Sequence, residues 1–445
     1  MEKMTFSLGA VRLPGCERRL SMGLFSMFSP FKIQNGVLVE YKNKSAGEVV
    51  IPPTVTEISA DAFAGCTALS SVTIPASVTK IADRALRANN RLAVHISDIG
   101  AWCKTDVGSE SLPMDWHLYV GSTPVTELVI PEGVREIGAY AFHSCRGITS
   151  VKMPASLVKI GRNAFSCCTA LTSAEIGKGV TTIGVSAFLL SGLKALTIPA
   201  GVSNVEYGAF GSCSALASVT VEGNTKIGEN AFEGDKKLAS LAFCGDATLE
   251  KGAFRGCIAL SAMTVEGSLN IGMEAFQACI NLAKVEGAGK ILQVGGKAFD
   301  RCKALTSMSV NGNIGISAFL DCIRLKEVTI GEGATVIGGC AFDNCESLAT
   351  VSLADSLTQI DKFAFARCGR LVSVTIPASV VQIGEYAFDQ CGALDSVTFA
   401  NTEGWYCAKG EGEKSGIAID VGEPISNARN LKNKTPGYVA YFWKR

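Results

Sequence analysis

The stretch AFARCGRLVSVTIPASVVQIGEYAFDQC, which runs from Ala364 to Cys391, decides the fold of this chain. It contains the motif AFxxC twice, and its two cysteines, Cys368 and Cys391, lie 23 residues apart. Two such thiols could form a disulfide, bind a metal, supply a nucleophile or simply fill a core. The choice depends on whether the spacing belongs to a site or to a repeat.

The dipeptide Ala-Phe marks a repeat, and we call its Phe the anchor. Apart from one gap after the second unit, 14 anchors follow one another at intervals of 20 to 23 residues. The anchors are Phe63, Leu86 in place of Phe, Phe142, Phe165, Phe188, Phe210, Phe232, Phe254, Phe276, Phe299, Phe319, Phe342, Phe365 and Phe388. Such a period predicts a solenoid, because one short unit cannot bury its own apolar face and must stack on its neighbours.

Residues within one unit have separate physical roles. The segment SVTI at 373–376 alternates polar and apolar side chains, which predicts a strand with one buried face. Pro377 ends that strand, Gly384 permits a tight bend, and Phe388 fills the interior. We therefore expect a β-rich solenoid of about 14 coils of 20–23 residues, with short parallel strands, one internal insert and terminal caps.

The full pattern, LxxVxIPxxVxxIGxxAFxxC, begins at Leu371 and ends at Cys391 in its clearest copy. It resembles the BspA-type leucine-rich repeat, and the resemblance covers roughly residues 48–400. The resemblance implies a leucine-rich-repeat solenoid of a kind found in bacterial surface proteins and in some protists. Adhesion and protein binding are the roles that it implies. It implies no common enzymatic activity and no set of functional residues that could be carried over.

Domain boundaries are expected where the repeat breaks. We predict an N-terminal extension over 1–30, a capping hairpin over 31–47, the first repeat units over 48–95, a Trp-containing insert over 96–124, the main solenoid over 125–400 and a C-terminal cap over 401–445. The hairpin has Asn35-Gly36 at its turn. Caps are needed because the terminal coils would otherwise expose the core. The extension lacks the cleavage pattern of a signal peptide. The sequence contains no run of 18 apolar residues, so no membrane-spanning helix is predicted.

Two tryptophans, Trp102 and Trp116, distinguish the insert. They could form a platform for a ligand, since loops often carry binding residues, or they could pack the insert onto the solenoid. Packing is the favoured hypothesis, because aromatic side chains contribute the largest apolar areas. The tail has similar spacing, with Trp405 and then Cys407 after a strand. We therefore expect the insert and the tail to be two copies of one structural closure.

The cysteines follow the repeat. Eleven of the 17 stand three residues after an anchor, and we expect them to form an inward column, the thiol ladder: Cys66, Cys145, Cys168, Cys213, Cys257, Cys279, Cys302, Cys322, Cys345, Cys368 and Cys391. Free Cys behaves as a small buried hydrophobe. Disulfides along the column are not expected, because equivalent side chains are about 4.8 Å apart whereas bridged Cβ atoms need about 3.8 Å.

Other reactive chemistry is scarce in the sequence. There is no CxxC pair and there are only three histidines, so no zinc site is predicted. His143 and Cys145 could be imagined as a nucleophilic pair, but His143 stands at a variable position and Cys145 is expected to point inward. The glycine-rich stretches lack a Walker lysine. We therefore predict no catalytic residues, no cofactor and no metal.

The outward side chains of the strands are the candidate binding face. They are Thr73, Lys152, Glu175, Thr197, Thr220, Thr264, Glu286, Thr329, Thr375 and Thr398. We expect a flat surface of small residues with no His and few aromatic rings. Two interpretations stay open: Thr suits a pleated strand in any case, or the surface is a broad docking face.

These observations predict a non-enzymatic protein that binds macromolecules, in protein–protein interaction or in adhesion to a host. A host matrix or surface protein, or a glycan, is the candidate partner. Lys plus Arg equals Asp plus Glu, at 41 each, so neither nucleic acid nor membrane insertion is expected. The alternative is an intracellular scaffold or effector-like module, since unpaired thiols suit a reducing compartment. Cell surface, secreted and cytoplasmic locations all stay open.

Overall fold

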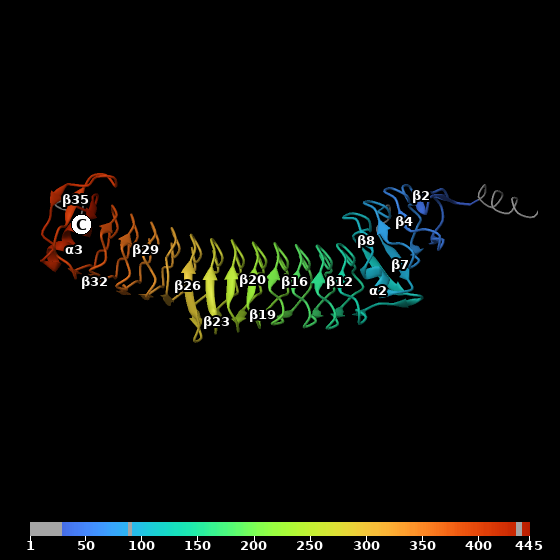
Figure 1. The fold of residues 1–445 in the computed structure, drawn as a ribbon, viewed down its shortest axis with the longest axis horizontal. Helices are drawn as coiled ribbons and strands as arrows, with labels where there is room; N and C mark the ends of the chain where they lie inside the picture. The colour runs from blue at the N-terminus through green and yellow to red at the C-terminus, as the bar shows by residue number, and fades with distance from the viewer. Residues whose placement is uncertain (1–28, 88–90, 433–437) are drawn as a thin grey trace, which may run out of the picture.

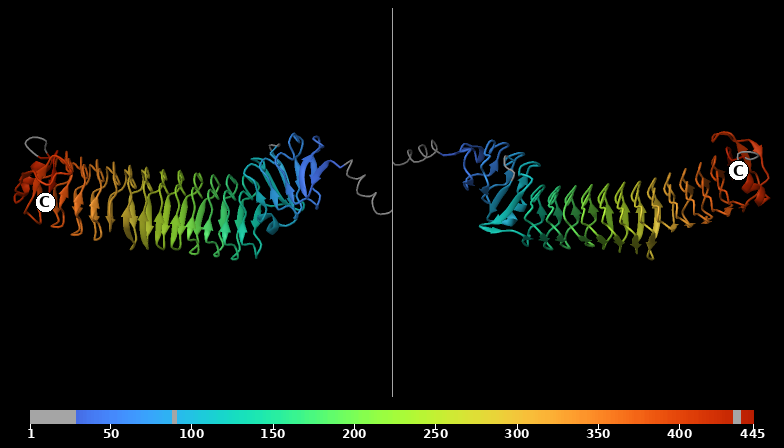
Figure 2. Two further views of the ribbon diagram at one scale, coloured as in Figure 1. Left: turned by 45° about the horizontal axis from the view of Figure 1, so that its top comes forward. Right: turned by 180° about the vertical axis from the view of Figure 1, so that it is seen from behind.

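The computed structural model describes residues 29–87, 91–432 and 438–445. It is an elongated solenoid with one bend in its N-terminal third and a cap at its C-terminal end (Figures 1 and 2). The predicted solenoid of short parallel strands is confirmed. It has about 16 turns where the repeat predicts about 14. The expected extension, 1–30, lies almost wholly outside the described residues.

One strand of each coil lies on the side that we call the strand face. Its N-terminal members are β3 (Glu48–Val50), β5 (Ser71–Thr73), β7 (Leu92–Ile96) and β9 (Trp116–Val120). Its later members are β11 (Glu127–Val129), β13 (Ser150–Lys152), β15 (Ser173–Glu175), β17 (Ala195–Ile198), β19 (Ser218–Val221), β21 (Ser240–Phe243), β23 (Ala262–Val265), β25 (Lys284–Glu286), β27 (Ser307–Val310), β28 (Glu327–Ile330), β30 (Thr350–Ser352), β32 (Ser373–Ile376) and β34 (Ser396–Phe399). Pairing is parallel and in register, so Thr197 lies opposite Thr220.

A second, shorter strand of most coils carries the aliphatic residue that stands five positions before the anchor. These strands are β4 (Glu57–Ile58), β6 (Lys80–Ile81), β8 (Asp106–Val107), β12 (Glu136–Ile137), β14 (Lys159–Ile160), β16 (Thr182–Ile183), β18 (Asn204–Val205), β20 (Thr225–Ile227), β22 (Ala247–Leu249), β24 (Ser268–Ile271), β26 (Lys290–Val294), β29 (Val336–Ile337), β31 (Gln359–Ile360) and β33 (Gln382–Ile383). The run from β12 to β26 forms one eight-stranded parallel sheet. The glycine after this strand allows close stacking: a Cβ on Gly161 would lie 2.5 Å from the carbonyl oxygen of Ile137.

The anchor turn has an unusual backbone. The residues two before and two after each anchor from Phe142 to Phe388 adopt left-handed conformations, as Asn163 (φ 52°) and Cys167 (φ 60°) do around Phe165. Every second N–H in the turn then points to the next coil, so that Phe165 donates to the carbonyl of Ala187 at 2.7 Å. The same direction is kept from coil to coil. The turn therefore adds a third hydrogen-bond ladder to the two ladders of the strands.

Anchor rings and thiols fill the interior beneath these turns. The rings from Phe142 to Phe388 are stacked with centroids 4.9–5.4 Å apart and planes within 11°. The eleven cysteines of the thiol ladder are 0% exposed. Nine of them lie 3.0–3.3 Å from the carbonyl oxygen of the anchor in the preceding coil, to which the thiol donates. The other two, Cys66 and Cys145, belong to the first coil of a stack, so no anchor of a directly preceding coil is available to them among the described residues.

Additional elements close both ends of the solenoid. They are β1 (Phe31–Gln34) and β2 (Val37–Tyr41) at the start, and β35 (Tyr406–Ala408), β36 (Ile417–Ala418), α3 (Pro424–Lys432) and β37 (Phe442–Lys444) at the end. The hairpin of β1 and β2 lies on the first coil, where the Tyr41 N–H donates to the carbonyl of Ala62 at 2.8 Å. At the other end, β37 pairs with β33, and Asn427 of α3 donates to the carbonyl of Val397 in β34 at 3.0 Å.

Asp235 replaces cysteine in one rung of the thiol ladder. Its side chain is 0% exposed, and its Oδ1 accepts the N–H of Cys213 at 2.7 Å. Its Oδ2 has no donor. Burial raises the pKa of Asp235 to about 9, so the carboxyl is protonated at neutral pH.

Replacing Asp235 by Asn keeps the size of the side chain and removes its titration. The unfolded chain releases the Asp proton near the ordinary pKa of 3.8, whereas the folded chain holds it to about pH 9. The wild type therefore loses stability relative to Asp235→Asn as the pH rises from 4 to 9, by at most about 1.4 kcal/mol per pH unit. Urea unfolding at several pH values measures this, and parallel pH profiles for the two proteins would contradict it.

Candidate functional site

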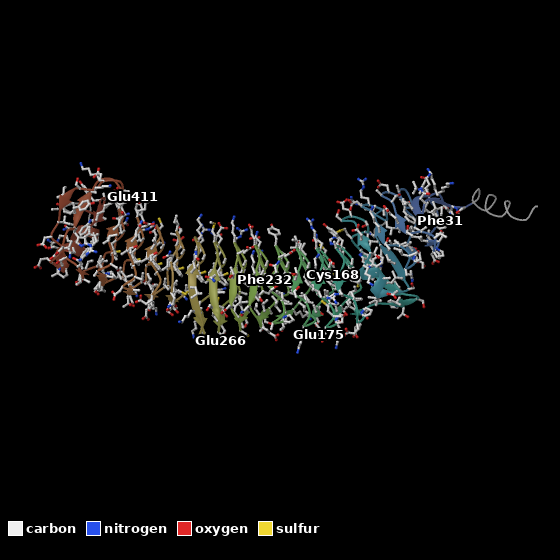
Figure 3. All side chains as sticks on the ribbon, viewed as in Figure 1. Phe31, Cys168, Glu175, Phe232, Glu266 and Glu411 are labelled. Carbon is white, nitrogen blue, oxygen red and sulfur yellow. The ribbon has the colours of Figure 1, made fainter. Side chains whose placement is uncertain are left out.

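The predicted binding face is exposed on one long edge of the solenoid. All ten predicted side chains belong to the outward column of the face strands; seven of them are exposed, and Thr73, Thr220 and Thr264 are half-buried. Glu175 marks this edge, at the lower side of Figure 3. Two exposed ion pairs, Lys152–Glu175 at 3.5 Å and Lys284–Glu286 at 3.6 Å, interrupt an otherwise polar and uncharged series. Exposed pairs of this kind contribute little stability, so the charges remain available to a partner.

Two aromatic residues that sequence reasoning missed belong to the same column. His95 and Tyr119 are in register with Thr73, so the expectation of a face without histidine is wrong. Their rings stack with centroids 4.6 Å apart, and Nδ1 of His95 lies 2.6 Å from the carbonyl oxygen of Gly121. The alternation in LAVHI and WHLYV could have identified these segments as face strands.

The segment expected to be an insert, 96–124, contains a coil of the stack. VGSESL at 107–112 has the spacing of IGxxAF, with Leu112 at the anchor position. Leu86 donates its N–H to the carbonyl of Ser111 at 2.8 Å, as anchors do elsewhere, and β8 pairs in parallel with β6. This coil was missed because neither Ala nor Phe is kept in its motif. It accounts for part of the difference in the number of turns.

The helix α2 (Ile99–Cys103) produces the bend. The main solenoid stacks on its end, where Gly138 donates to the carbonyl of Cys103 at 2.8 Å, and on β9. The strand β9 also turns back as a hairpin with β10 (Thr123–Pro124). No such helix follows Phe399 in the tail, where strand β35 comes next. The prediction that insert and tail are two copies of one device is therefore wrong.

Trp102 and Trp116 join the two stacks. In a regular coil, the carbonyls on either side of the anchor accept N–H groups from the preceding turn, but no such turn precedes Phe142 directly. The indole N–H of Trp102 instead donates to the carbonyl of Ala141 at 2.9 Å, and that of Trp116 to His143 at 2.7 Å. The two rings are 3% and 0% exposed, so they offer no platform for a ligand.

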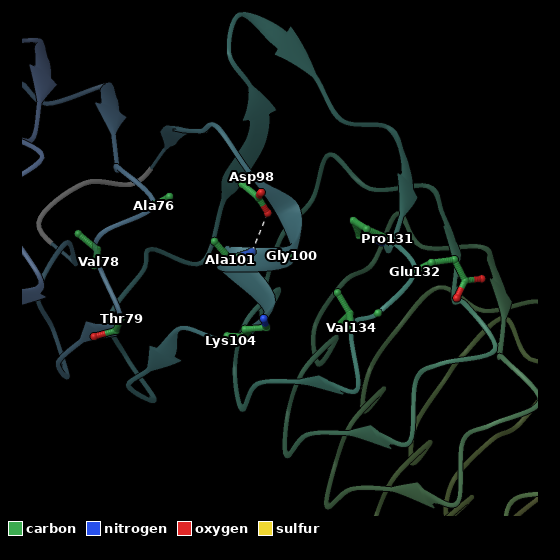
Figure 4. A pocket seen from close by; sticks show the side chains of 11 residues that line it. Ala76, Val78, Thr79, Asp98, Gly100, Ala101, Lys104, Pro131, Glu132 and Val134 are labelled. Carbon is green, nitrogen blue, oxygen red and sulfur yellow. Dashed lines mark hydrogen bonds between the residues drawn. The ribbon is translucent and has the colours of Figure 1, made fainter.

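The bend leaves a recess of about 530 Å³ beside α2 (Figure 4). Its polar side chains are those of Thr79, Asp98, Lys104 and Glu132. The carboxylate of Asp98 accepts the N–H of Ala101 at 2.7 Å and so caps the helix. The recess follows from the separation of the two stacks by α2, which holds apart turns that otherwise touch.

The cysteine and histidine chemistry considered from the sequence is unfavourable in the structure. Burial raises the pKa of Cys145 to about 12, which opposes the thiolate, and burial lowers the pKa of His143. Among the described residues, all sixteen cysteines are free, and no three His, Cys, Asp or Glu side chains are grouped to hold a metal. The described helices are too short to cross a membrane.

Comparisons with known proteins agree with the repeat. A family model described as the BspA type leucine rich repeat region, in six copies, matches residues 39–99, 117–239, 225–315 and 312–404. A solved leucine-rich repeat protein from Bacteroides ovatus is 26% identical, with a TM-score of 0.49 over 81% of this chain and 82% of that one. A leucine rich cell surface protein from Faecalibacterium prausnitzii is 23% identical, with a TM-score of 0.36 over 82% and 91%. No curated protein matches the chain.

Replacing Trp102 or Trp116 by Phe keeps an aromatic ring and removes the indole N–H. Each change leaves a buried carbonyl without its donor, so the free energy of unfolding should fall by roughly 1–3 kcal/mol. Trp405→Phe is the matched control, because its N–H bonds to the carbonyl of Asn401 within its own loop. Urea unfolding followed by circular dichroism gives the comparison. Losses no greater than that of Trp405→Phe would argue against the joining role.

Thiol labelling of the native protein distinguishes the ladder from the other cysteines. In a Cys16→Ser background, the exposed Cys244 should react first with N-ethylmaleimide, and the half-buried Cys167 and Cys340 should follow. The ladder should react only on unfolding, since it is buried. Intact-mass measurement over time counts the modified thiols, and Cys244→Ser should remove the fast step. Rapid modification of a ladder member would contradict the expectation.

Proposed function

Since this chain belongs to the family of BspA type leucine rich repeat proteins, we propose that it is a non-enzymatic scaffold that binds other macromolecules through its strand face. Proteins are the first class of partner. The observation that supports this most is the outward column along the stack, whose side chains are all exposed or half-buried. Extended solenoid surfaces of this kind suit binding.

The strand face is well organised for binding. Its strands are held in five parallel-paired sheets by hydrogen bonds between coils, so little conformational entropy is lost when a partner docks. The stacked rings of His95 and Tyr119 supply aromatic contact area at its N-terminal end. Small side chains elsewhere allow a partner to approach the sheet closely.

Within this function, we propose adhesion or host interaction, with a host matrix or surface protein, or a glycan, as partner. The roles implied by the family support this choice. The second candidate is an intracellular scaffold or effector-like module. It is supported by the sixteen described cysteines, all of them free, which suit a reducing compartment.

A binding screen against host matrix proteins, glycans and cytosolic extracts tests the proposal and separates its two forms. The double variant Thr220→Arg/Thr264→Arg places two large charged side chains on the strand face, and we expect it to weaken binding at least about tenfold. Thr248→Arg is the matched control, because Thr248 is exposed on β22, away from that face. Equal binding by the wild type and the double variant would refute a role for the strand face.

A further inference from the structure

The strand face has two recesses, each at a coil that departs from the repeat. The first, of about 590 Å³, includes β15, where Ala174 stands at a position that holds Val, Leu or Met in every other face strand. The second, of about 230 Å³, includes the end of β25, where Gly287 occupies a position that is otherwise large and apolar. Both recesses therefore have a cause in the sequence.

Each departure leaves a recess whose floor consists of apolar side chains that are themselves mostly buried. Ala174 lacks the bulk that would fill its position. Gly287 has a φ of 108°, and a Cβ there would lie 2.2 Å from the carbonyl oxygen of Val265, so the backbone lies close against the preceding coil and has no side chain to fill the position. The apolar lining includes Met153, Ile176 and Leu196 in the first recess, and Val285, Ile291 and Met308 in the second.

The surface between the recesses is small and uncharged. It consists of the outward side chains of β17, β19, β21 and β23, namely Ala195, Thr197, Ser218, Thr220, Ser240, Ala242, Ala262 and Thr264. Charges stand at its two ends, where Lys152 pairs with Glu175 and Lys284 pairs with Glu286. The charged side chains that line the first recess are Glu132, Lys152, Glu175, Lys178 and Glu222, and those that line the second are Glu286 and Glu327.

The distance between the two recesses determines how many residues of an extended peptide would span them. Five strand steps lead from β15 to β25, which at about 4.8 Å each gives about 24 Å. An extended chain advances about 3.3 Å per residue, so about seven residues span this distance. Successive side chains of an extended chain point to opposite sides. Two anchors that point to the same side are therefore separated by an even number, six or eight.

We propose that the strand face binds an extended segment of a partner protein, laid along the solenoid axis, with two apolar side chains six or eight residues apart, one in each recess. The proposal rests on the proposed function and specifies the chemistry of the partner. The residues between the two anchors are uncharged, to match the strip beneath them. A basic residue next to the second anchor finds opposite charges in Glu286 and Glu327, whereas the first recess offers both Lys and Glu side chains.

A series of fluorescein-labelled peptides tests the spacing. Each carries two leucines at positions i and i+n in a Ser/Thr/Ala background, with n from 3 to 9, and one peptide carries a single leucine. Fluorescence polarisation with the full chain measures the dissociation constants. We expect the tightest binding at n of 6 or 8, about tenfold tighter than at n of 3 or 7 and than the single-leucine peptide.

Variants of the chain locate the two anchors. Ala174→Leu fills the first recess with the residue type that β17 carries at the same position, as Leu196, so the fold should tolerate it. Ser309→Arg covers the second recess, and Ser352→Arg, two strands further along the same column, is its matched control. The first two variants should bring the two-leucine peptide to the affinity of the single-leucine peptide, and the control should bind as the wild type does.

Binding that is independent of the leucine spacing, or unaffected by Ala174→Leu, overturns this inference. Failure of every peptide to bind overturns it as well. None of these results affects the proposed function, which depends on whether Thr220→Arg/Thr264→Arg loses its partner in the screen. The two proposals therefore stand or fall on separate measurements.

Discussion

The hydrogen bonds between neighbouring coils are the constraint on which the whole structure depends. Each coil leaves the N–H and C=O groups of two strands and one anchor turn directed along the stack axis, and unpaired buried groups of this kind are costly. The anchor turn is the strictest case, because its left-handed residues turn every second N–H toward the same end of the molecule. The thiols add a fourth set of donors, which bond to the anchor carbonyls of the preceding coil.

The irregular features described above provide hydrogen-bond partners where a neighbouring coil is missing or altered. The N-terminal hairpin brings an N–H to the first turn, and α3 and β37 cover the last strands. At the bend, two indole N–H groups take the place of a missing turn. Asp235 accepts the N–H of Cys213 between two coils, and burial keeps its carboxyl protonated at neutral pH. The tryptophans that looked like a binding site are part of this pairing.

The sequence predicted the repeating part of the molecule well, because period and residue type are local properties. It predicted the strand column and the positions of the anchors. It did not predict the coil at Leu112, where packing tolerates Ser and Leu in place of Ala and Phe. The role of Trp102 depends on a carbonyl 39 residues away, which no local pattern reveals. The recesses could have been predicted from Ala174 and Gly287, but only after the face strands had been aligned with one another.

The single direction of the turn ladder has a consequence for how such a chain can change over generations. A duplicated coil arrives with donors on one side and acceptors on the other, already matched to the neighbours between which it is inserted. Deletion of a coil leaves an equally matched pair. The length of the molecule can therefore vary by whole coils without redesign of its core, while a change within one coil, such as Val to Ala on the strand face, alters the surface at one place only. The number of coils and the shape of the strand face can therefore evolve independently of each other.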